Sequence, residues 1–297
     1  MLENFYTCYV ANSYHDAEFG VDVPNILFLQ PSTDYTIESI DGLTPPQVSI
    51  SGTPLIGTDG QILSNNRIDT RTITITLHIN NPIETNRIKL YEIFKLKKKI
   101  GIYFKNGTRD VHIVGYVETF EINLFSMKQV AQITIKCLDP YLKSGEHYVY
   151  LSQSRDEFEY PFAHSDEGEI ISEYNVNNDA TFEYNGDVET GVEIEMVNRG
   201  ETEIVGPITI HTAETNKFLA LSYNIRANEK IVINTNVGEK SILSHYNEKQ
   251  YTKLETFTDG STWLKVTPGK NTFYFETKNG DRNIEMILKY TEKYWGV

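Results

Sequence analysis

Hydrophobic and polar residues alternate one for one along much of the chain, a pattern typical of β-strands with one buried face. The clearest example starts at Arg71, where isoleucine or leucine takes every second position as far as Ile79 and threonine or histidine fills the positions between. The 19 tyrosines and 14 phenylalanines suit such pleated surfaces. The pattern therefore predicts a mainly β protein.

One segment predicts a helix. Asn81 and Pro82 suit its start, and Glu84 stands where the carboxylate of a capping box is expected. The apolar residues of one face are Ile83, Leu90, Tyr91 and Phe94. Lysines follow, whose charge complements the carbonyl end of a helix, and Gly101 is the expected stop. We expect this helix to cover a sheet, which makes the first domain α+β.

Turn-forming residues divide the chain into two halves. The stretch 139–145 contains Pro, Ser and Gly and predicts a boundary, with domains at 1–142 and 143–297. Turn signals separate short strands in the second half, which favours an antiparallel β-sandwich of jelly-roll type. The expected strands are Ile170–Tyr174, Val192–Val197, Ile208–His211, Ile231–Asn234, Ile242–His245, Phe273–Glu276 and Ile284–Tyr290.

Two connections in the first half have distinctive sequences. Residues 51–66 are rich in Gly and Asn and have little apolar periodicity, so they form either a long exposed loop or a projecting hairpin arm. Asn106-Gly107 lies between two apolar-containing runs. This dipeptide predicts a β-hairpin in which both turn residues have positive φ.

Length and charge reduce the number of functional classes that fit the sequence. The 297 residues suffice for about two domains. A formal charge of −14 argues against binding of DNA or RNA, which requires cations against phosphates. No apolar run approaches the ~18 residues of a membrane span, and residues 1–6 lack the features of a signal peptide. Two cysteines, Cys8 and Cys137, are too few for a disulfide scaffold, so we expect synthesis in a reducing cytoplasm.

Motifs for catalysis or cofactor binding are missing from the sequence. Gly52 and Gly57 have the spacing of a phosphate loop, but Thr58 stands where its lysine is required. There is no GxSxG nucleophile elbow, and the seven histidines include no HExxH pair. We therefore expect neither an enzyme nor a bound cofactor.

The segment 156–203 is strongly acidic, with 15 Asp and Glu against one basic residue. Its oxygen-rich residues Asp166, Glu167, Glu169 and Glu173 are candidates for a calcium site. Glu193 and Glu195 are candidates for a glycosidase pair. Alternation in this run instead directs the carboxylates outward from an ordinary strand, and we favour this solvated sandwich face over either site.

Two further features have a functional and a structural interpretation. One is a basic cluster, which either faces a channel or an acidic neighbouring subunit or is the solvated end of the helix. It consists of Lys95, Lys97, Lys98, Lys99, Lys105 and Arg109. We favour the helix end. Strand parity places Trp263 outward, where it would stack on a sugar ring, but a Trp covered by its own domain is favoured.

Taken together, the order and spacing of short motifs resemble the distal tail proteins of long-tailed bacteriophages and prophages. In the first half the motifs are Tyr35-x-Ile37 with Asp41-Gly42, Gly57-x-Asp59-Gly60, Arg71-x-Ile73-x-Ile75, Arg109-x-Val111-x-Ile113-x-Gly115-Tyr116, Phe125-Ser126-Met127-Lys128-Gln129 and Cys137-Leu138-Asp139-Pro140-Tyr141. In the second half they are Asn198-x-Gly200, Pro207-Ile208-Thr209-Ile210 and Trp263-Leu264-x3-Pro268-Gly269-x-Asn271.

The resemblance implies a structural protein without catalytic residues. By this resemblance, we expect a hexameric ring at the virion tail tip. Such a ring would join the tail tube protein to the tail-tip hub and would lie next to receptor-binding proteins. The first domain would form the ring, with an arm around Gly57, Asp59 and Gly60 that clasps the next subunit. Lys97, Lys98, Lys99 and Arg109 would face the channel or an interface. The second domain would be a galectin-like sandwich.

Two alternatives remain open from the sequence. The second domain is a carbohydrate-binding module that grips host cell-wall saccharide, or the protein is a glycosidase with paired carboxylates.

Overall fold

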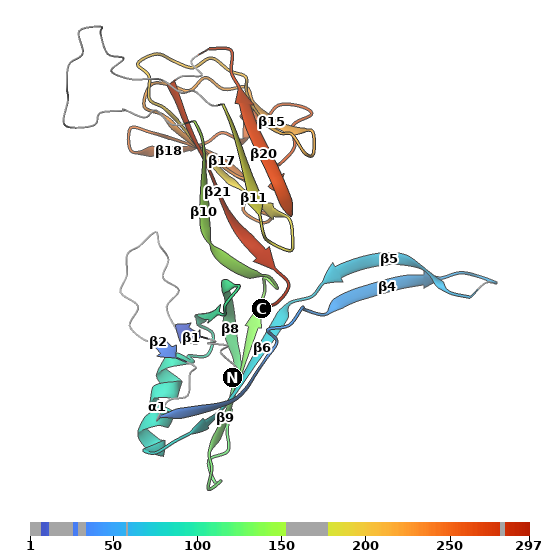
Figure 1. Cartoon of the computed structure of the whole chain (residues 1–297), viewed down its shortest axis with the longest axis vertical. Coiled ribbons are helices and arrows are strands. Elements are labelled where there is room, and N and C mark those ends of the chain that lie inside the picture. Colours follow the sequence, from blue (N-terminus) through green and yellow to red (C-terminus); the bar gives the residue numbers. More distant parts are fainter. Residues whose placement is uncertain (1–6, 12–25, 29–33, 58, 153–177, 280–282) are drawn as a thin grey trace. The chain divides into compact units, whose positions relative to one another are not determined.

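The computed structural model describes residues 7–11, 26–28, 34–57, 59–152, 178–279 and 283–297 (Figure 1). The mainly β fold class predicted from the sequence is confirmed. The described residues form two compact units, which we call unit 1 and unit 2. Unit 1 comprises residues up to Gly145 together with Lys293–Val297, and unit 2 comprises Glu146–Glu292. The chain thus returns to unit 1 for its last five residues, which the boundary at 142/143 had placed in the second domain.

Unit 1 is built on one antiparallel sheet with the order β3-β6-β9-β8-β7-β1-β2. These strands are β1 (Thr7–Ala11), β2 (Ile26–Phe28), β3 (Tyr35–Asp41), β6 (Arg71–Ile79), β7 (Lys99–Lys105), β8 (Asp110–Ile122) and β9 (Val130–Cys137). The alternation along β6 places Ile73, Ile75 and Leu77 in the core, each fully buried. The same core receives Leu90 from helix α1 (Ile83–Ile93) and Phe94, the residue that follows the helix.

The helix is shorter than its sequence pattern predicts. Pro82 precedes its first turn without a side-chain cap, so Asn81 does not cap it. The backbone N–H of Phe94 donates to Leu90 and closes the last turn at Ile93. The lysines therefore lie beyond the helix, and Gly101 sits within β7, opposite Val114. Tyr91 is 45% exposed, and its ring lies 5.1 Å from that of Phe120, which packs against the same core.

The hairpin at Asn106 forms as predicted, but with a different turn. β7 and β8 pair as far as Lys105 and Asp110, so the loop contains four residues. The Oδ1 atom of Asn106 accepts hydrogen bonds from the backbone N–H groups of Thr108 and Arg109. This side-chain cap replaces the two positive-φ residues expected of a tighter turn.

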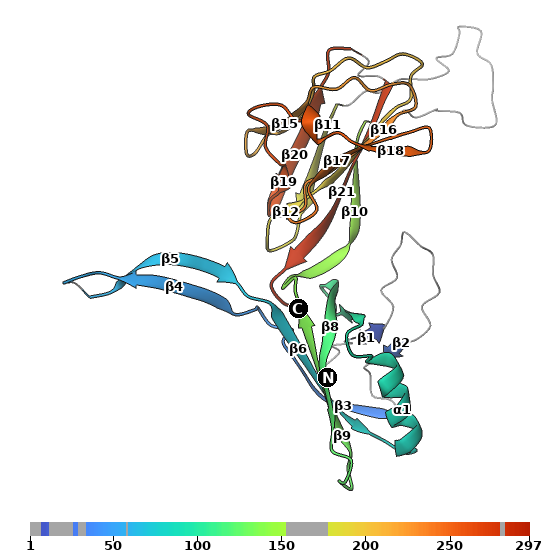
Figure 2. The same cartoon turned by 180° about the vertical axis from the view of Figure 1, so that it is seen from behind.

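A separate two-stranded ribbon interrupts the sheet between β3 and β6. It consists of β4 (Val48–Pro54) and β5 (Gln61–Ile68), which pair only with each other. We call this ribbon the arm, and it extends away from the sheet of unit 1 (Figure 2). Of the two forms left open for residues 51–66, the structure contains the hairpin.

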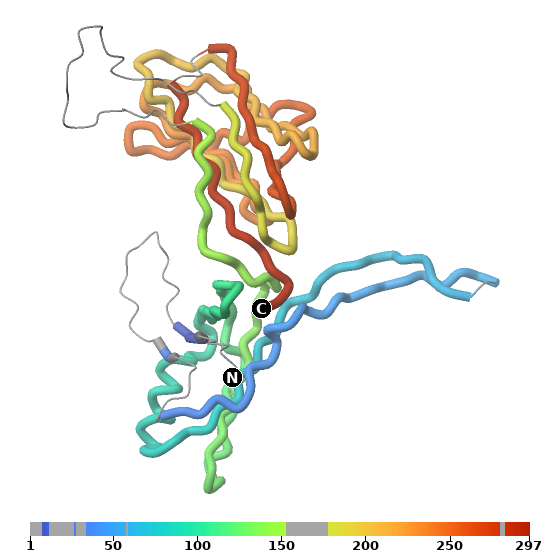
Figure 3. The backbone as a smooth tube through the Cα atoms, in the orientation of Figure 1, coloured from blue at the N-terminus to red at the C-terminus, as the bar shows by residue number. Residues whose placement is uncertain are grey.

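Unit 2 is a β-sandwich (Figure 3). One sheet has the order β18-β17-β16-β13-β21-β10 and the other β11-β20-β14-β15, with a β12–β19 pair besides. Buried residues from both sheets, including Met196, Leu288, Ile210 and Phe273, form one core. The strands are β10 (Leu142–Ser152), β11 (Asp179–Tyr184), β12 (Thr190–Gly191), β13 (Glu193–Asn198), β14 (Ile208–Thr212), β15 (Lys217–Leu221), β16 (Lys230–Asn234), β17 (Ser241–Tyr246), β18 (Lys249–Thr252), β19 (Lys265–Val266), β20 (Gly269–Glu276) and β21 (Ile284–Tyr294), with a 3-10 turn at Leu254–Thr256. The predicted strand Ile170–Tyr174 lies outside the described residues.

Candidate functional site

The arm is the first candidate interaction surface. Almost all of its residues are exposed, and Gly57 and Gly60 at its tip adopt positive φ with open space around them. Asp59 is exposed beside them. A lone two-stranded ribbon has no core of its own and is marginally stable in water. The arm therefore has the form of a segment that packs against something else.

Close to its root, one face of the arm is more apolar than the other, although beyond the bulge Ile62 pairs with Thr53 on the more polar face and is 58% exposed. Val48 pairs with Ile68, and Ile50 pairs with Asn66, so these side chains share a face. Ser49, Ser51 and their partners Arg67 and Asn65 occupy the opposite face. This asymmetry is the pattern of a strand pair with one side meant for burial.

A β-bulge keeps this apolar face continuous. Ser51 pairs with Asn65 but Gly52 pairs with Leu63, which leaves Ser64 as an extra residue in β5. Beyond the bulge Leu63 therefore shares the face of Ile50. Ser64 turns toward Thr53, and their hydroxyl oxygens lie 2.6 Å apart. Ile50 is 70% exposed, Leu63 59% and Val48 47%.

The root of the arm is held by Arg71, which is 3% exposed. Its Nε donates to the carbonyl oxygen of Pro140 at 2.7 Å, and its Nη1 donates to those of Gly42 and Thr44 at 2.8 and 3.0 Å. Its Nη2 donates to the carbonyl oxygen of Trp295 at 2.5 Å. One buried guanidinium thus ties the arm root, the exit toward unit 2 and the C-terminal segment together.

A second arginine anchors the C-terminal segment. Arg109 donates a hydrogen bond from Nη1 to the carbonyl oxygen of Gly296, and its guanidinium lies 4.5 Å from the ring centre of Tyr294. Its charge is therefore directed at its own chain. Lys97, Lys98 and Lys99 are exposed at the opposite end of β7, a strand of seven residues that spans about 20 Å. The structure does not bring Arg109 together with these lysines.

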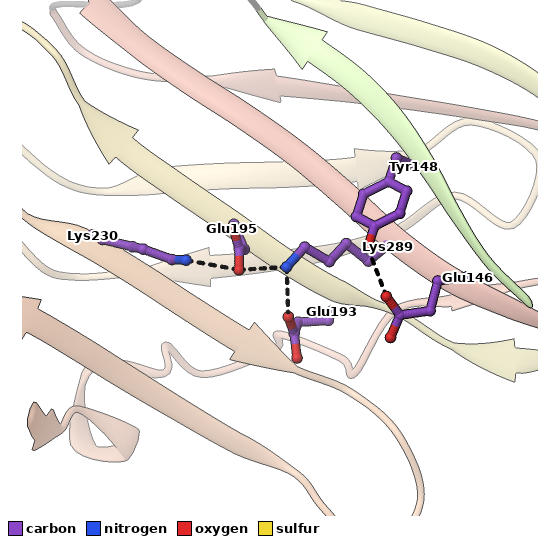
Figure 4. A network of polar contacts seen from close by, with 6 residues as sticks. All are labelled: Glu146, Tyr148, Glu193, Glu195, Lys230 and Lys289. Carbon is purple, nitrogen blue, oxygen red and sulfur yellow. Dashed lines mark hydrogen bonds and ion pairs between the residues drawn. The ribbon is translucent and has the colours of Figure 1, made fainter. Parts of the chain in front are cut away.

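A charged network crosses the exposed face of the larger sheet of unit 2 (Figure 4). The Nζ of Lys289 lies 3.4 Å from Glu193 Oε1 and 2.6 Å from Glu195 Oε1, and Lys230 Nζ lies 2.8 Å from the same Glu195 oxygen. Burial raises the pKa of Glu195, but hydrogen bonds from Lys230 and Lys289 outweigh it and hold that pKa below its ordinary value.

This network does not fit the proposed glycosidase pair. A glycosidase needs one carboxylic acid whose pKa is raised so that it is protonated. Glu195 is shifted in the opposite direction, and Lys289 contacts both carboxylates. The outward strand face favoured from the sequence describes these residues better, and the structure adds the ion pairs with Lys230 and Lys289.

Trp263 is half-buried against its own unit, as favoured from the sequence. Its ring stacks on Phe257 with centres 4.9 Å apart, the Nζ of Lys240 lies 5.5 Å from its centre, and it packs against the core of unit 2. Tyr148 and Tyr150 are more open, each 51% exposed on β10.

The calcium candidates Asp166, Glu167, Glu169 and Glu173 lie outside the described residues. Within the described ranges, no cluster of His, Cys, Asp or Glu side chains is arranged to hold a metal ion. No helix in that part of the chain is long and apolar enough to span a membrane.

Sequence reasoning missed a second apolar surface, the loop that joins β8 to β9. We call residues 124–129 the β8–β9 tip. Phe125 and Met127 are each 100% exposed, and Leu124 is 42% exposed. In the sequence, these residues are part of the motif Phe125-Ser126-Met127-Lys128-Gln129, but nothing in the motif indicated that Phe125 and Met127 are exposed.

Comparison with protein families gives matches in both halves of the chain. Residues 28–137 match the model described as the phage tail protein RIFT-related domain. Residues 185–294 match the model described as the siphovirus-type tail component, C-terminal domain. No curated protein matches the sequence.

Comparison with solved structures also gives matches, and the first of these shares the fold. The Dit protein (gp 19.1) of phage SPP1, described as a paradigm of the hub adsorption apparatus in phages that infect Gram-positive bacteria, shares 11% identity at a TM-score of 0.62. The match covers 88% of this chain and 93% of that one. Chains of the phage P2 baseplate in its activated conformation, with Ca or with Sr, each share 7% identity at a TM-score of 0.48 and cover 96% of this chain. The match covers 97% of the baseplate chain in the structure with Ca and 98% of the baseplate chain in the structure with Sr.

Proposed function

This chain belongs to the distal tail (Dit) proteins, siphovirus-type components of the phage tail tip, and from that premise we propose that six copies close into a ring. Unit 1 forms the ring and joins the tail tube protein to the tail-tip hub. Unit 2 is a docking surface that supports host-adhesion components such as receptor-binding proteins. The protein acts through these surfaces and catalyses no reaction.

The apolar face of the arm supports this proposal. Val48, Ile50 and Leu63 are all exposed on the same face of the arm, and adjacent exposed apolar side chains are typical of surfaces that bind another protein. A ring requires a surface on each copy that docks on a different surface of the next copy. An arm that extends from the sheet of unit 1 meets this requirement, since it reaches a neighbour without distorting the core.

The test is to place a charge on each face of the arm. Ile50→Lys puts an ammonium on the apolar face, and Ser51→Lys puts the same group on the polar face of the same strand. We expect wild type and Ser51→Lys to show six times the 34.1 kDa mass of one chain in native mass spectrometry. Ile50→Lys should dissociate to folded single chains. Rings that persist in Ile50→Lys would contradict the arm as the clasp, and a wild-type chain that stays single at high concentration would contradict the ring.

A further inference from the structure

Four lysines lie in the turn between helix α1 and the start of strand β7. We call residues 95–99, with the sequence Lys-Leu-Lys-Lys-Lys, the lysine turn. The helix ends at Ile93 and has no basic residue in its last turn. Because the effect of a helix dipole falls off within that turn, it does not account for a group of four lysines at this place. The lysine turn therefore requires another explanation.

The lysine turn presents its charges to solvent without a counter-charge. The backbone N–H of Lys98 donates to the carbonyl oxygen of Lys95 at 3.3 Å, and Lys97 has a positive φ of 65°, which is uncommon for a residue other than glycine. All four lysines are exposed, and Leu96 between them is 59% exposed. None of the four forms an ion pair with a carboxylate of the described residues.

A row of aromatic side chains crosses the outer face of the smaller sheet of unit 2. Its members lie opposite one another on strands β11, β20, β14 and β15, in the order Asp179, Tyr274, His211 and Phe218. The ring centres of Tyr274 and His211 are 4.6 Å apart, and those of His211 and Phe218 are 6.0 Å apart. Glu276 is the next residue after Tyr274 on the same face of β20. We call these five residues the aromatic face.

The two carboxylates of the aromatic face lack a cationic side chain as a strong partner. Asp179 forms no ion pair with a described residue, and Glu276, which is 69% exposed, has only His211 Nε2 at 3.9 Å. Lys270, the lysine at an outward position of β20, lies opposite Glu183 near the other end of that strand. On the larger sheet, by contrast, the glutamates of β13 are paired with lysines of the same sheet. The smaller sheet therefore offers negative charge to a partner.

We propose that the lysine turn of one copy docks on the aromatic face of a neighbouring copy. This inference rests on the proposed ring and adds a second contact to it, at surfaces separate from the arm. The lysine ammonium groups pair with Asp179 and Glu276. Their methylene chains and the side chain of Leu96 cover the rings of Tyr274 and Phe218, and an ammonium group over a ring is itself attracted to it.

Charge complementarity argues for a second copy as the occupant. The chain carries 41 acidic and 27 basic residues, so copies that pack in a ring repel one another unless opposite charges meet at their contacts. Lys97–Lys99 is the longest uninterrupted run of basic residues in the sequence, and the aromatic face has carboxylates to receive it. Nucleic acid phosphates would also attract these lysines, but the surplus of carboxylates in the chain would repel the rest of the nucleic acid.

A cross-link between isotopically distinct copies tests the contact. Chains labelled with heavy nitrogen are mixed with unlabelled chains, allowed to exchange, and treated with a water-soluble carbodiimide, which joins an amine directly to a carboxylate in contact with it. We expect hybrid peptides in which a lysine of the turn from one isotope is linked to Asp179 or Glu276 from the other. Links found only between peptides of the same isotope would overturn the proposal, because the turn would then pair within its own chain.

Charge reversal gives a second test with matched controls. Lys98→Glu puts a carboxylate in the lysine turn, and Glu276→Lys puts an ammonium on the aromatic face. Each change alone should raise the concentration at which the ring dissociates by about tenfold, and both changes in one chain should restore it. Lys128→Glu in unit 1 and Glu239→Lys in unit 2 should leave it unchanged, because both residues are exposed and lie outside the two surfaces.

The outcomes separate this inference from the ring itself. Rings that are as stable in Lys98→Glu as in wild type would overturn the inference and leave the ring in place, whereas a wild-type chain that stays single would overturn both. Loss of the ring in Lys98→Glu without rescue by Glu276→Lys would overturn the aromatic face as the acceptor. Binding of the wild-type chain to a DNA duplex that is lost in Lys98→Glu would overturn the proposal in favour of a phosphate contact.

Discussion

The Nη2 of Arg71 donates a hydrogen bond to the carbonyl oxygen of Trp295 across 224 positions of sequence, at 2.5 Å. The same guanidinium holds the backbone at Gly42, Thr44 and Pro140. All four acceptors are neutral carbonyl groups, so the arginine acts as a set of directed donors rather than as half of an ion pair. Removing it leaves several strand ends of unit 1 without their common support.

Replacing Arg71 with Met should destabilise unit 1 strongly. The change leaves buried carbonyl oxygens unsatisfied, at a cost of about 3 kcal/mol or more. Urea unfolding can be followed by the fluorescence of Trp295, in a background where Trp263 is Phe. Arg199→Met is the control, because Arg199 forms an exposed pair with Glu285 that contributes at most about 1 kcal/mol. Equal midpoints for the two variants would show that the Arg71 hydrogen bonds contribute little.

Gly42→Ala should cost more stability than Gly60→Ala, although both glycines have positive φ, +92° and +101°. A Cβ on Gly42 would lie 2.1 Å from the carbonyl oxygen of Thr72, whereas nothing lies within 4 Å of one on Gly60. Gly60→Ala carries only the left-handed strain of about 1 kcal/mol, and Gly42→Ala adds a backbone clash. The comparison of melting temperatures checks this. A Gly42→Ala chain as stable as Gly60→Ala would refute the close approach at the arm root.

The charged network should make unit 2 less stable in acid. The folded-state pKa of Glu195 lies below its ordinary value of 4.5. The contribution of Glu195 to the stability of unit 2 is therefore complete above pH 4.5 and is lost as the pH falls through the folded-state pKa. The pKa of Lys289 is raised above 10.5, because the attraction of Glu195 and Glu193 exceeds the opposing effect of burial. The contribution of Lys289 to the stability of unit 2 is complete below pH 10.5 and is lost only as the pH rises through the raised pKa.

The free energy of unfolding in urea should therefore be higher for wild type than for Glu195→Gln, by about 1 kcal/mol, at pH values between the pKa of Glu195 and the pKa of Lys289. In strong acid the two free energies should become equal. Glu189→Gln is a suitable control because Glu189 forms an exposed pair with Lys265. A difference between wild type and Glu195→Gln that does not change with pH would show that the carboxylate of Glu195 is not stabilised by the two lysines.

Neither cysteine should react while the protein is folded. Burial raises the pKa of both Cys8 and Cys137 to about 12, so almost no thiolate is present at pH 8. A thiol reagent such as DTNB should modify both residues only in denaturant. Fast modification of one thiol in the native protein would show that its strand opens locally.

The strands were predictable where one face is buried, because burial imposes a period of two on the sequence. Ile73, Ile75 and Leu77 in β6 show this directly. The end of α1 was not predictable on the same grounds. The lysines after Phe94 continue a helix-compatible composition, but Ile100 and Ile102 are required in the sheet core, and the chain leaves the helix to supply them.

The exposed apolar surfaces of unit 1 were harder to predict because they lack a buried face within one chain. The alternation in the arm is interrupted by the extra residue Ser64, so Ile50 and Leu63 share a face that the sequence alone does not reveal. The role of Arg71 left no pattern either, since its partners are backbone carbonyls from three distant segments. The basic residues are adjacent in sequence, but the length of β7 separates Lys99 from Arg109.

The two crossings between units have an evolutionary consequence. Strands β10 and β21 are neighbours in the sheet, and the chain enters unit 2 along one and leaves along the other. The segment Glu146–Glu292 is thus inserted into unit 1 and joined to it at two points. Recombination at those points can therefore exchange unit 2 as a whole, while Arg71 and Arg109 keep the last five residues bound within unit 1.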